Sequence, residues 1–148
     1  LMLHTEIVTA VQEGIKLTIV LDDNHGFGCI HHLQRGRGGR SFGNEFRRRA
    51  SQTRRLTGDF TSVDFVANAR SLGATARRVS TPEELREALA ATKETPGVVV
   101  IVIEVPADQG LPGYAWWDVP VSDTSRLPGV IAARKDYEKA VKKQRFHY

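Results

Sequence analysis

The chain contains little of three things that would each mark a particular class of protein. It has one cysteine among 148 residues, Cys29, which excludes an internal disulfide framework and fits a reducing compartment. Its longest apolar run, Val98 to Ile103, is far shorter than the roughly 20 residues that span a membrane. No basic region followed by an apolar one opens the sequence, as it would in a secretory signal peptide. We therefore expect a cytoplasmic protein.

Acidic residues are also scarce in one stretch. Residues 35 to 55 hold eight arginines but one acid, Glu45, which gives this stretch a net charge of +7. The whole chain carries +4, so the remainder carries −3, which is not the profile of a uniformly basic nucleic-acid binder. Glycines punctuate the same region without a helical or strand period. We expect residues 34 to 62 to form an irregular Arg/Gly-rich loop.

What is present at the start is a short helix followed by a strand. Apolar side chains recur at helical spacing until Gly14 ends the pattern: Leu3, Ile7, Val8 and Val11. Residues 16 to 21 are rich in β-branched side chains and predict a buried strand. Residues 22 to 28, Asp-Asp-Asn-His-Gly-Phe-Gly, predict a turn directly after it.

Strands and helices then alternate. Residues 62 to 73 predict a helix that Ser62 caps, and residues 74 to 79 predict a strand. Thr81 suits the N-cap of a further helix, with Pro82 at its first position. Residues 98 to 105 are apolar on both faces and predict a central strand. This order predicts an α/β fold, an open parallel sheet with flanking helices and right-handed crossovers.

The remaining segment, residues 106 to 148, is expected to be a tail and a terminal helix of a single domain that covers residues 1 to 148. The tail is rich in proline and glycine and contains Trp116 and Trp117, which we expect to pack in the core or at a subunit interface. The terminal helix is predicted near residues 130 to 145.

Oxygen-bearing side chains cluster in the turn after the first strand. Asp22, Asp23 and Asn24 supply carboxylate and amide oxygens, the ligands that Mg²⁺ prefers together with phosphate oxygens. Gly26 and Gly28 leave backbone N–H groups that could bind a diphosphate. Ligands of open α/β sheets bind beyond the carboxyl ends of the strands, which is where this turn falls. A plain Asx-rich turn without a ligand is the alternative.

The segment from Leu17 to Gly28, Leu-Thr-Ile-Val-Leu-Asp-Asp-Asn-His-Gly-Phe-Gly, resembles the second half of the cofactor motif of the thiamin-diphosphate enzyme superfamily. That motif opens with Gly-Asp-Gly and closes with an Asn pair; here Asp23 stands at the first position of the pair, and the opening triplet would fall before Leu1. Residues 63 to 74 and 81 to 89 resemble the distal half of the same diphosphate-binding domain. The resemblance covers roughly residues 1 to 105.

The resemblance implies a site and two cofactors, thiamin diphosphate and Mg²⁺. The metal would be held by the side chain of Asn24 and the backbone carbonyl of Gly26. The backbone at Gly28 and Cys29 would contact the diphosphate. The full set of implied cofactor-binding residues is Asn24, Gly26, Phe27, Gly28, Cys29 and Ile30.

A finer resemblance concerns the reaction. Residues 25 to 30, the loop of residues 34 to 47 and residues 132 to 138 are similar to hydrolases of inositol breakdown that open a polyhydroxylated cyclic 1,2-diketone by cleaving a C–C bond. The alternatives are another enzyme of the superfamily, of the acetolactate synthase or 2-oxoacid decarboxylase type, and a basic-loop nucleic-acid-binding module. The loop of residues 35 to 47 is not associated with those other enzymes, which favours the hydrolase.

The resemblance also implies that this chain is incomplete for catalysis. The glutamate that activates the cofactor lies on a separate pyrimidine-binding domain in the superfamily, on another subunit of a homodimer or tetramer. We assign no catalytic residue here, since Glu6 and Glu104 fall on a predicted helix and strand without evidence of that role. An apolar helix that begins at Leu1 without a cap favours missing upstream polypeptide, with a trimmed N-terminus as the alternative.

Several side chains keep more than one interpretation. The arginine loop is interpreted as a lid over cofactor and substrate, with a solvated or disordered loop and a nucleic-acid contact as alternatives. His25 or His31 could contact substrate hydroxyls or relay protons, although a packing or surface role is the common case. The spacing of His25, His31 and His32 does not favour a zinc site. Cys29 is expected to act through its backbone.

Overall fold

The computed structural model describes residues 3–107 and 121–144, which form two compact units. The sheet unit consists of residues 1–24 and 62–106, and the loop unit of residues 25–61 and 107–148. The elements of the sheet unit are α1 (Glu6–Gln12), β1 (Leu17–Asp23), α3 (Phe65–Ser71), β2 (Thr75–Val79), α4 (Pro82–Thr92) and β3 (Val98–Glu104). Those of the loop unit are α2 (Gly28–Gly36) and α5 (Pro128–Val141).

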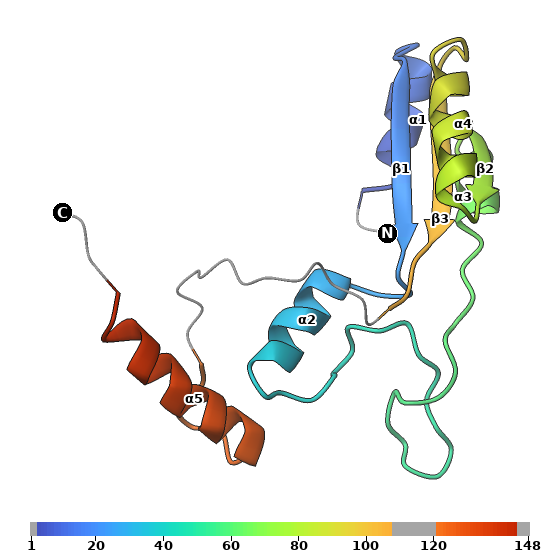
Figure 1. Ribbon diagram of the computed structural model, residues 1–148. Helices are drawn as coiled ribbons and strands as arrows, with labels where there is room; N and C mark the ends of the chain where they lie inside the picture. The colour runs from blue at the N-terminus through green and yellow to red at the C-terminus, as the bar shows by residue number, and fades with distance from the viewer. Residues whose placement is uncertain (1–2, 108–120, 145–148) are drawn as a thin grey trace. The chain divides into compact units, whose positions relative to one another are not determined.

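Three parallel strands in the order β1-β3-β2 form the sheet, which confirms the predicted open parallel sheet with flanking helices (Figure 1). Leu17 pairs with Val98 on one side of β3, and Thr75 pairs with Val99 on the other. The central place of β3 was also predicted correctly. Its sequence, Val-Val-Val-Ile-Val-Ile-Glu, is buried over the first five residues because helices cover both faces.

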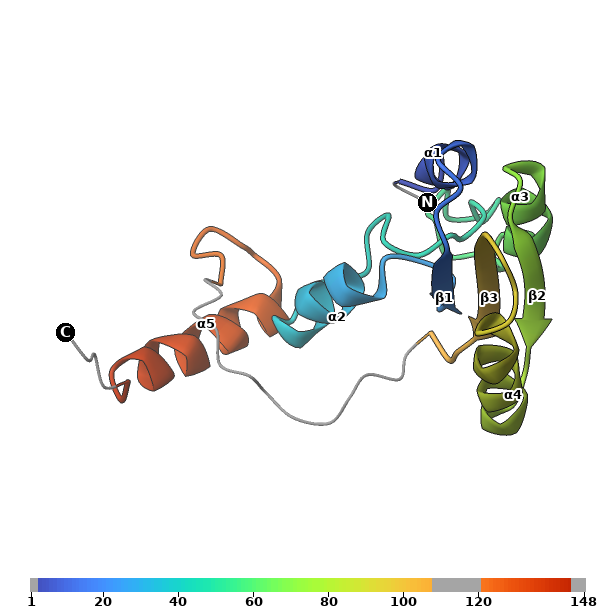
Figure 2. The same ribbon diagram turned by 90° about the horizontal axis from the view of Figure 1, so that it is seen from above.

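Helices cover both faces of the sheet, α1 and α3 on one and α4 on the other (Figure 2). On one face, α4 places Ala88 against Val79, Val99 and Ile101 of the strands. On the other, α1 and α3 contribute the buried side chains Ile7, Ala10, Phe65 and Ala69. Of the apolar side chains at helical spacing in this segment, Ile7 is buried, while Val8 and Val11 are 37% and 41% exposed. Ala10, which is outside that spacing, is buried as well.

Helix starts follow the local chemistry of their caps. Thr81 caps α4 as predicted, accepting a hydrogen bond from the backbone N–H of Glu84 at 3.1 Å, with Pro82 at the first helical position. The prediction that Ser62 caps the next helix was wrong. Asp64 does so, since its carboxylate accepts from the N–H of Ala67 at 2.9 Å and α3 begins at Phe65.

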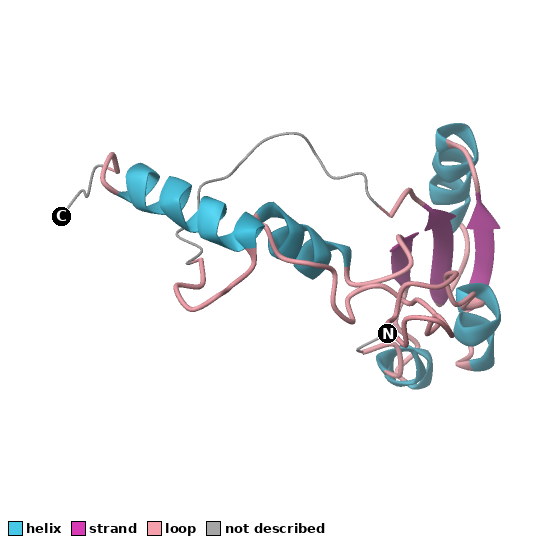
Figure 3. Cartoon of the chain, turned by 90° about the horizontal axis from the view of Figure 1, so that it is seen from below, coloured by secondary structure: helices cyan, strands magenta, loops and turns pink. Residues whose placement is uncertain are grey.

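The largest departure from the sequence prediction is around residues 22–36. β1 extends through Asp22 and Asp23, which the sequence placed in a turn, and α2 occupies residues that the sequence placed in a turn and an irregular loop. In α2 the buried side chain is that of His31, while Ile30 and Leu33 are 52% and 44% exposed. Residues 37–61 contain neither helix nor strand, as predicted (Figure 3).

Within the loop unit, α5 begins against the chain that leaves α2. Gly129 in the first turn of α5 lies against Gly38. The predicted terminal helix near residues 130–145 is therefore present, starting two residues earlier at Pro128. The prediction for Trp116 and Trp117 lies outside the described residues. Among the residues that the structure describes, no helix is long and apolar enough to cross a membrane.

Candidate functional site

The predicted site residues fall at the end of β1 and in the segment that follows it. Asp23, the last residue of β1, is 6% exposed, and its carbonyl accepts a hydrogen bond from the N–H of Val105 at 3.0 Å. Asn24 comes directly after, at the carboxyl end of a parallel strand. The carboxyl ends of the strands are where α/β proteins bind their ligands.

The next residues, 25–27, form the start of the loop unit and pair with residues 44–46 in antiparallel fashion. The N–H of Phe27 donates to the carbonyl of Asn44, and the N–H of Phe46 donates to the carbonyl of His25, both at 2.7 Å. Gly26 and Glu45 face each other between these two hydrogen bonds. The backbone around Gly26 is thereby fixed by a segment that lies some twenty residues further along the chain.

Gly26 must be a glycine because of this pairing. A β-carbon on Gly26 would overlap the carbonyl oxygen of Asn44 and stand 2.9 Å from the Cα of Glu45. The preceding residue, His25, has a φ of 59°, in the left-handed region that side chains rarely adopt. Close approach on one side and an unusual dihedral on the other give this turn a single shape.

The first turn of α2 offers backbone donors without a side-chain cap. Phe27 is the N-cap, its side chain has no oxygen that could accept from the first N–H groups, and the first turn contains no acidic residue. The first intrahelical hydrogen bond runs from the N–H of His31 to the carbonyl of Phe27 at 2.9 Å. The N–H groups of Gly28, Cys29 and Ile30 therefore precede the helical ladder. An anion such as a diphosphate is the kind of ligand that such a helix start attracts.

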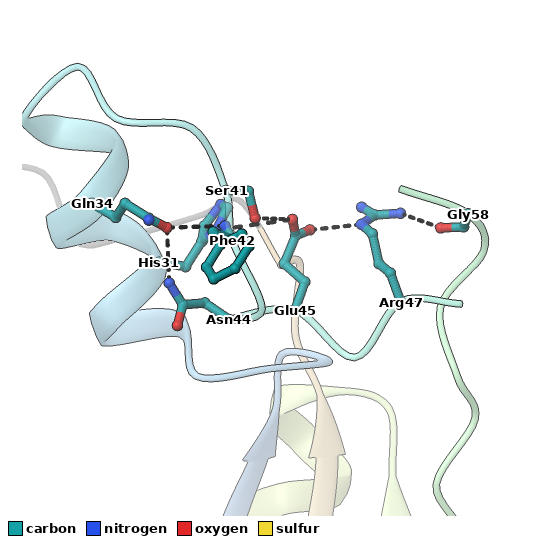
Figure 4. A network of polar contacts seen from close by, with 8 residues as sticks. All are labelled: His31, Gln34, Ser41, Phe42, Asn44, Glu45, Arg47 and Gly58. Atoms are coloured by element: carbon teal, nitrogen blue, oxygen red, sulfur yellow. Dashed lines mark hydrogen bonds and ion pairs between the residues drawn. The ribbon is translucent and has the colours of Figure 1, made fainter. Parts of the chain in front are cut away.

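Glu45 is the centre of a polar network that the sequence analysis did not identify (Figure 4). Its carboxylate accepts from Ser41 Oγ at 2.6 Å and from Arg47 Nε at 2.8 Å, and Oε2 lies 3.9 Å from Nδ1 of His31. Its side chain is 15% exposed. The one signal in the sequence was that Glu45 is the sole acid between residues 35 and 55.

The charge of Glu45 is maintained by its neighbours. Burial on its own would raise the pKa of this carboxyl group, but the hydrogen bonds from Ser41 and Arg47 oppose it. With the charges of Arg47 and His31 added, the pKa lies below its ordinary value of 4.5. Glu45 is consequently ionised near neutral pH and holds its donors as charge-assisted hydrogen bonds.

The network extends to both ends of the arginine loop. On one end, Gln34 Oε1 in α2 accepts from Nδ2 of Asn44 at 2.9 Å and from the N–H of Phe42 at 3.1 Å. On the other, Nη1 of Arg47 donates to the carbonyl of Gly58 at 3.2 Å. The arginine loop is thus attached to α2 through Gln34 and to the segment of residues 58–61 through Gly58 (Figure 4).

Aromatic contacts with Phe60 also attach Arg47 and His25 to the segment of residues 58–61. The guanidinium of Arg47 lies 3.8 Å from the ring centroid of Phe60, and the imidazole of His25 stacks on the same phenyl ring at 4.7 Å. His25 therefore packs within the loop unit. His31 is 4% exposed and belongs to the interior of the loop unit.

Among the described residues, no three His, Cys, Asp or Glu side chains are close enough to hold a metal ion. Cys29 is exposed in the first turn of α2. Of the eight arginines, Arg47 is engaged as described, while Arg48, Arg49, Arg54 and Arg55 are exposed.

Comparison with known proteins decides the family. Residues 1–103 match the family "Thiamine pyrophosphate enzyme, C-terminal TPP binding domain". The chain belongs to this family. The resemblance found in residues 17–28 and in the later segments is thereby confirmed, and the matched range includes the turn, α2 and the arginine loop as well as the sheet.

Several relatives of the chain share one name. The chain is 44% identical over 133 residues to "3D-(3,5/4)-trihydroxycyclohexane-1,2-dione hydrolase 2" of Bacillus cereus (strain ZK / E33L). Proteins with that name, without the final number, are 43% identical in Bacillus anthracis and 42% in Bacillus thuringiensis (strain Al Hakam). Each match covers 89% of this chain and 21% of the relative, so the chain spans about a fifth of their length.

Proposed function

We propose that this chain is the diphosphate- and magnesium-binding part of a thiamin-diphosphate-dependent hydrolase, one that cleaves a C–C bond of a cyclic 1,2-diketone in inositol breakdown. The observation that carries the proposal is 44% identity over 89% of the chain to a trihydroxycyclohexane-dione hydrolase. That similarity includes the arginine loop, which the sequence analysis already associated with this hydrolase. A cytoplasmic location is part of the proposal.

The proposed ligands are those implied by the motif. The side chain of Asn24 and the carbonyl of Gly26 hold Mg²⁺, and the backbone of Phe27, Gly28, Cys29 and Ile30 holds the diphosphate. Two features of the chain support this assignment. Gly26 is compressed by the backbone of residues 44 and 45, so no side chain could occupy its place, and the first turn of α2 has no cap of its own.

When bound, thiamin diphosphate supplies an electron sink for C–C bond cleavage. The residues of this chain bind and orient the diphosphate end and neutralise it through the metal. The exposed arginines 48, 49, 54 and 55 belong to the proposed lid over cofactor and hydroxylated substrate. Their cationic side chains would pair with anionic groups rather than take part in proton transfer.

The partner of this chain is proposed to be the remaining polypeptide of the enzyme, including a pyrimidine-binding domain with the catalytic glutamate, in a homodimer or tetramer. The sheet supports this. Both edges of the sheet are open among the described strands, but β2 carries Arg77 and Arg78, charges of the kind that protect an edge. In β1, residues 17–21 carry no charge, and Leu17 and Val20 are 40% and 42% exposed.

An apolar cavity lies beside the same strand. It has a volume of about 280 Å³, and α1, β1 and α3 line it with side chains that include Ile7, Ile19 and Phe65. On the opposite face, α4 packs on β3 and β2, and Val20 of β1 stays uncovered. Uncovered apolar surface on both faces of one edge strand is typical of a subunit or domain contact.

Cofactor binding tests the proposal directly. The melting temperature of the chain should rise when thiamin diphosphate and Mg²⁺ are added together, because a ligand that binds the folded state stabilises it by mass action. Thiamin diphosphate with EDTA should produce a smaller rise. An oligonucleotide that stabilises the chain in low salt, while the cofactor does not, would contradict the proposal.

Matched variants locate the binding. Asn24→Ala should remove most of the cofactor-dependent rise, because a proposed metal ligand is lost. Asn68→Ala, a helical asparagine in α3, should keep it. Equal loss in both variants would point to an unspecific effect on stability and against the assigned ligands.

A further inference from the structure

Glu45 connects the arginine loop to the turn of residues 25–27, which we call the diphosphate turn because it is predicted to bind the diphosphate. Its backbone faces Gly26, and hydrogen bonds at 2.7 Å run on each side of this pair, from Phe27 to Asn44 and from Phe46 to His25. The segment of residues 44–46 is therefore the support on which the turn of residues 25–27 rests. Whatever holds residues 44–46 in place also sets the direction of the Gly26 carbonyl.

Backbone hydrogen bonds and side-chain contacts together hold that segment, since the N–H of Thr61 also donates to the carbonyl of Phe46 at 2.6 Å. Residues 37–61 include no strand or helix, and the described backbone pairs near Glu45 are the isolated bridges Gly26 with Glu45 and Arg47 with Phe60. The carboxylate of Glu45 contacts residues on both sides of this segment and in α2. It accepts from Ser41 before the segment and from Arg47 after it, and it lies 3.9 Å from His31 in α2.

The contacts of Arg47 complete the arrangement. While Nε donates to Glu45, Nη1 donates to the carbonyl of Gly58 and the guanidinium covers the ring of Phe60 at 3.8 Å. The same ring stacks on His25, whose φ of 59° sets the shape of the turn. Glu45 therefore reaches the turn by two routes, through its own backbone to Gly26 and through Arg47 and Phe60 to His25.

We infer that Glu45 is a positioning residue for the diphosphate turn, whose carboxylate locks residues 44–47 against residues 25–27 and so sets the Gly26 carbonyl and the first turn of α2. The inference rests on the proposed function, in which Gly26 is a metal ligand. Glu45 does not itself touch metal or cofactor. Its two carboxylate oxygens are engaged by Ser41 and Arg47, and its side chain is 15% exposed.

The arginine loop gains a second role from this arrangement. Its first half, through Glu45, supports the cofactor turn, while the exposed arginines 48, 49, 54 and 55 lie further along. The single acid among the eight arginines attaches Arg47, while most of the other arginines are exposed. The shape of the turn becomes dependent on the loop.

Amide exchange in the chain without any ligand tests the support. The N–H groups of Phe27 and Phe46 are direct reporters, because each forms one of the two flanking hydrogen bonds. In Glu45→Gln, NMR should show exchange at both amides about tenfold faster, as expected when a charge-assisted hydrogen bond is lost. Ser41→Ala, which removes one donor, should give a smaller acceleration at the same two amides.

The matched control is Asp59→Asn, which removes one acid from the same unit at an exposed position. Exchange at Phe27 and Phe46 should match the unaltered chain in this variant. Unchanged exchange at these amides in Glu45→Gln would overturn the inference. Acceleration spread evenly over α2 and α5 would also overturn it, since that reports general loss of stability.

Metal binding then separates this inference from the proposed function. Mn²⁺, followed by electron paramagnetic resonance with thiamin diphosphate present, should bind about tenfold more weakly to Glu45→Gln and normally to Asp59→Asn. Asn24→Ala should lose Mn²⁺ while keeping normal exchange at Phe27 and Phe46. No Mn²⁺ binding by the unaltered chain would defeat the proposed function, whereas equal binding by Glu45→Gln and the unaltered chain would defeat the inference alone.

Discussion

Gly38 and Gly129 lie backbone to backbone, where the chain leaving α2 meets the first turn of α5. A β-carbon on Gly38 would overlap the carbonyl group of Gly129 and stand 2.7 Å from the nitrogen of Val130. In the other direction, a β-carbon on Gly129 would stand 2.9 Å from the carbonyl oxygen of Gly38. Two segments some ninety residues apart in sequence are joined at a place that accepts no side chain.

We expect Gly38→Ala to destabilise the loop unit more than Gly43→Ala. Both glycines have positive φ, 74° and 68°, so both substitutions incur the left-handed backbone penalty of about 1–2 kcal/mol. Gly43 has open space around it, while Gly38 adds an overlap with backbone that costs about 1–3 kcal/mol. Urea unfolding followed by the circular dichroism of the helices measures the difference, and equal losses would contradict the close contact.

The cap of α3 can be tested with two neighbouring residues. Asp64→Ala should lower the free energy of unfolding by about 1 kcal/mol, because the N–H of Ala67 loses its acceptor. Ser62→Ala should change it by less than about 0.5 kcal/mol, as an exposed substitution outside the helix. The reverse order would support the cap that the sequence suggested.

The same substitution at two valines separates buried from uncovered strand surface. Val102→Ala in β3, at 0% exposure, should cost about 2 kcal/mol or more through lost apolar burial and the cavity left behind. Val20→Ala in β1, at 42% exposure, should cost well under about 1 kcal/mol in the isolated chain. Thermal and urea unfolding give both values, and a large cost at Val20 would mean that this surface is covered.

Glu45 predicts a particular dependence of stability on pH. Its pKa in the folded chain lies below the ordinary 4.5, so its stabilising contribution is full above that value and is lost as pH falls through the folded pKa. Glu45→Gln should therefore be less stable than the unaltered chain at neutral pH, and the difference should shrink below pH 4.5. Unfolding curves at about pH 7 and pH 3 measure it. A difference that grows towards acid pH would contradict the ion-paired network.

Much of the sheet unit could be predicted from the sequence, because apolar runs and helix caps depend on residues that are close together in the chain. The apolar run of Val98 to Val105 indicated a strand buried on both faces, and the structure places β3 at the centre. Thr81 and Pro82 marked a helix start through hydrogen bonding and fixed dihedrals, which depend on a few neighbouring residues. In α1 the apolar spacing did not reveal that Ala10 is buried while Val8 and Val11 are partly exposed.

The loop unit shows the limit of such signals. α2 buries His31 and exposes Ile30 and Leu33, so the buried side of this helix could not be recognised from hydrophobicity. Residues 37–61 are held by backbone hydrogen bonds such as that from Arg48 to Asp59, and by a carboxylate, a serine and an arginine whose contact no spacing rule predicts. The motif at residues 22–28 indicated which residues form the turn, but not what supports it.

By itself, the sequence determined the parallel sheet, its central strand and the family, because strand burial, helix caps and the Asp-Asp-Asn-His-Gly-Phe-Gly segment are local patterns of residue chemistry. Only the tertiary structure decided that Glu45 faces Gly26 and that Gly38 meets Gly129. Those contacts join segments distant in the chain, where the geometry of the whole unit, rather than the preference of any one residue, sets which atoms can approach.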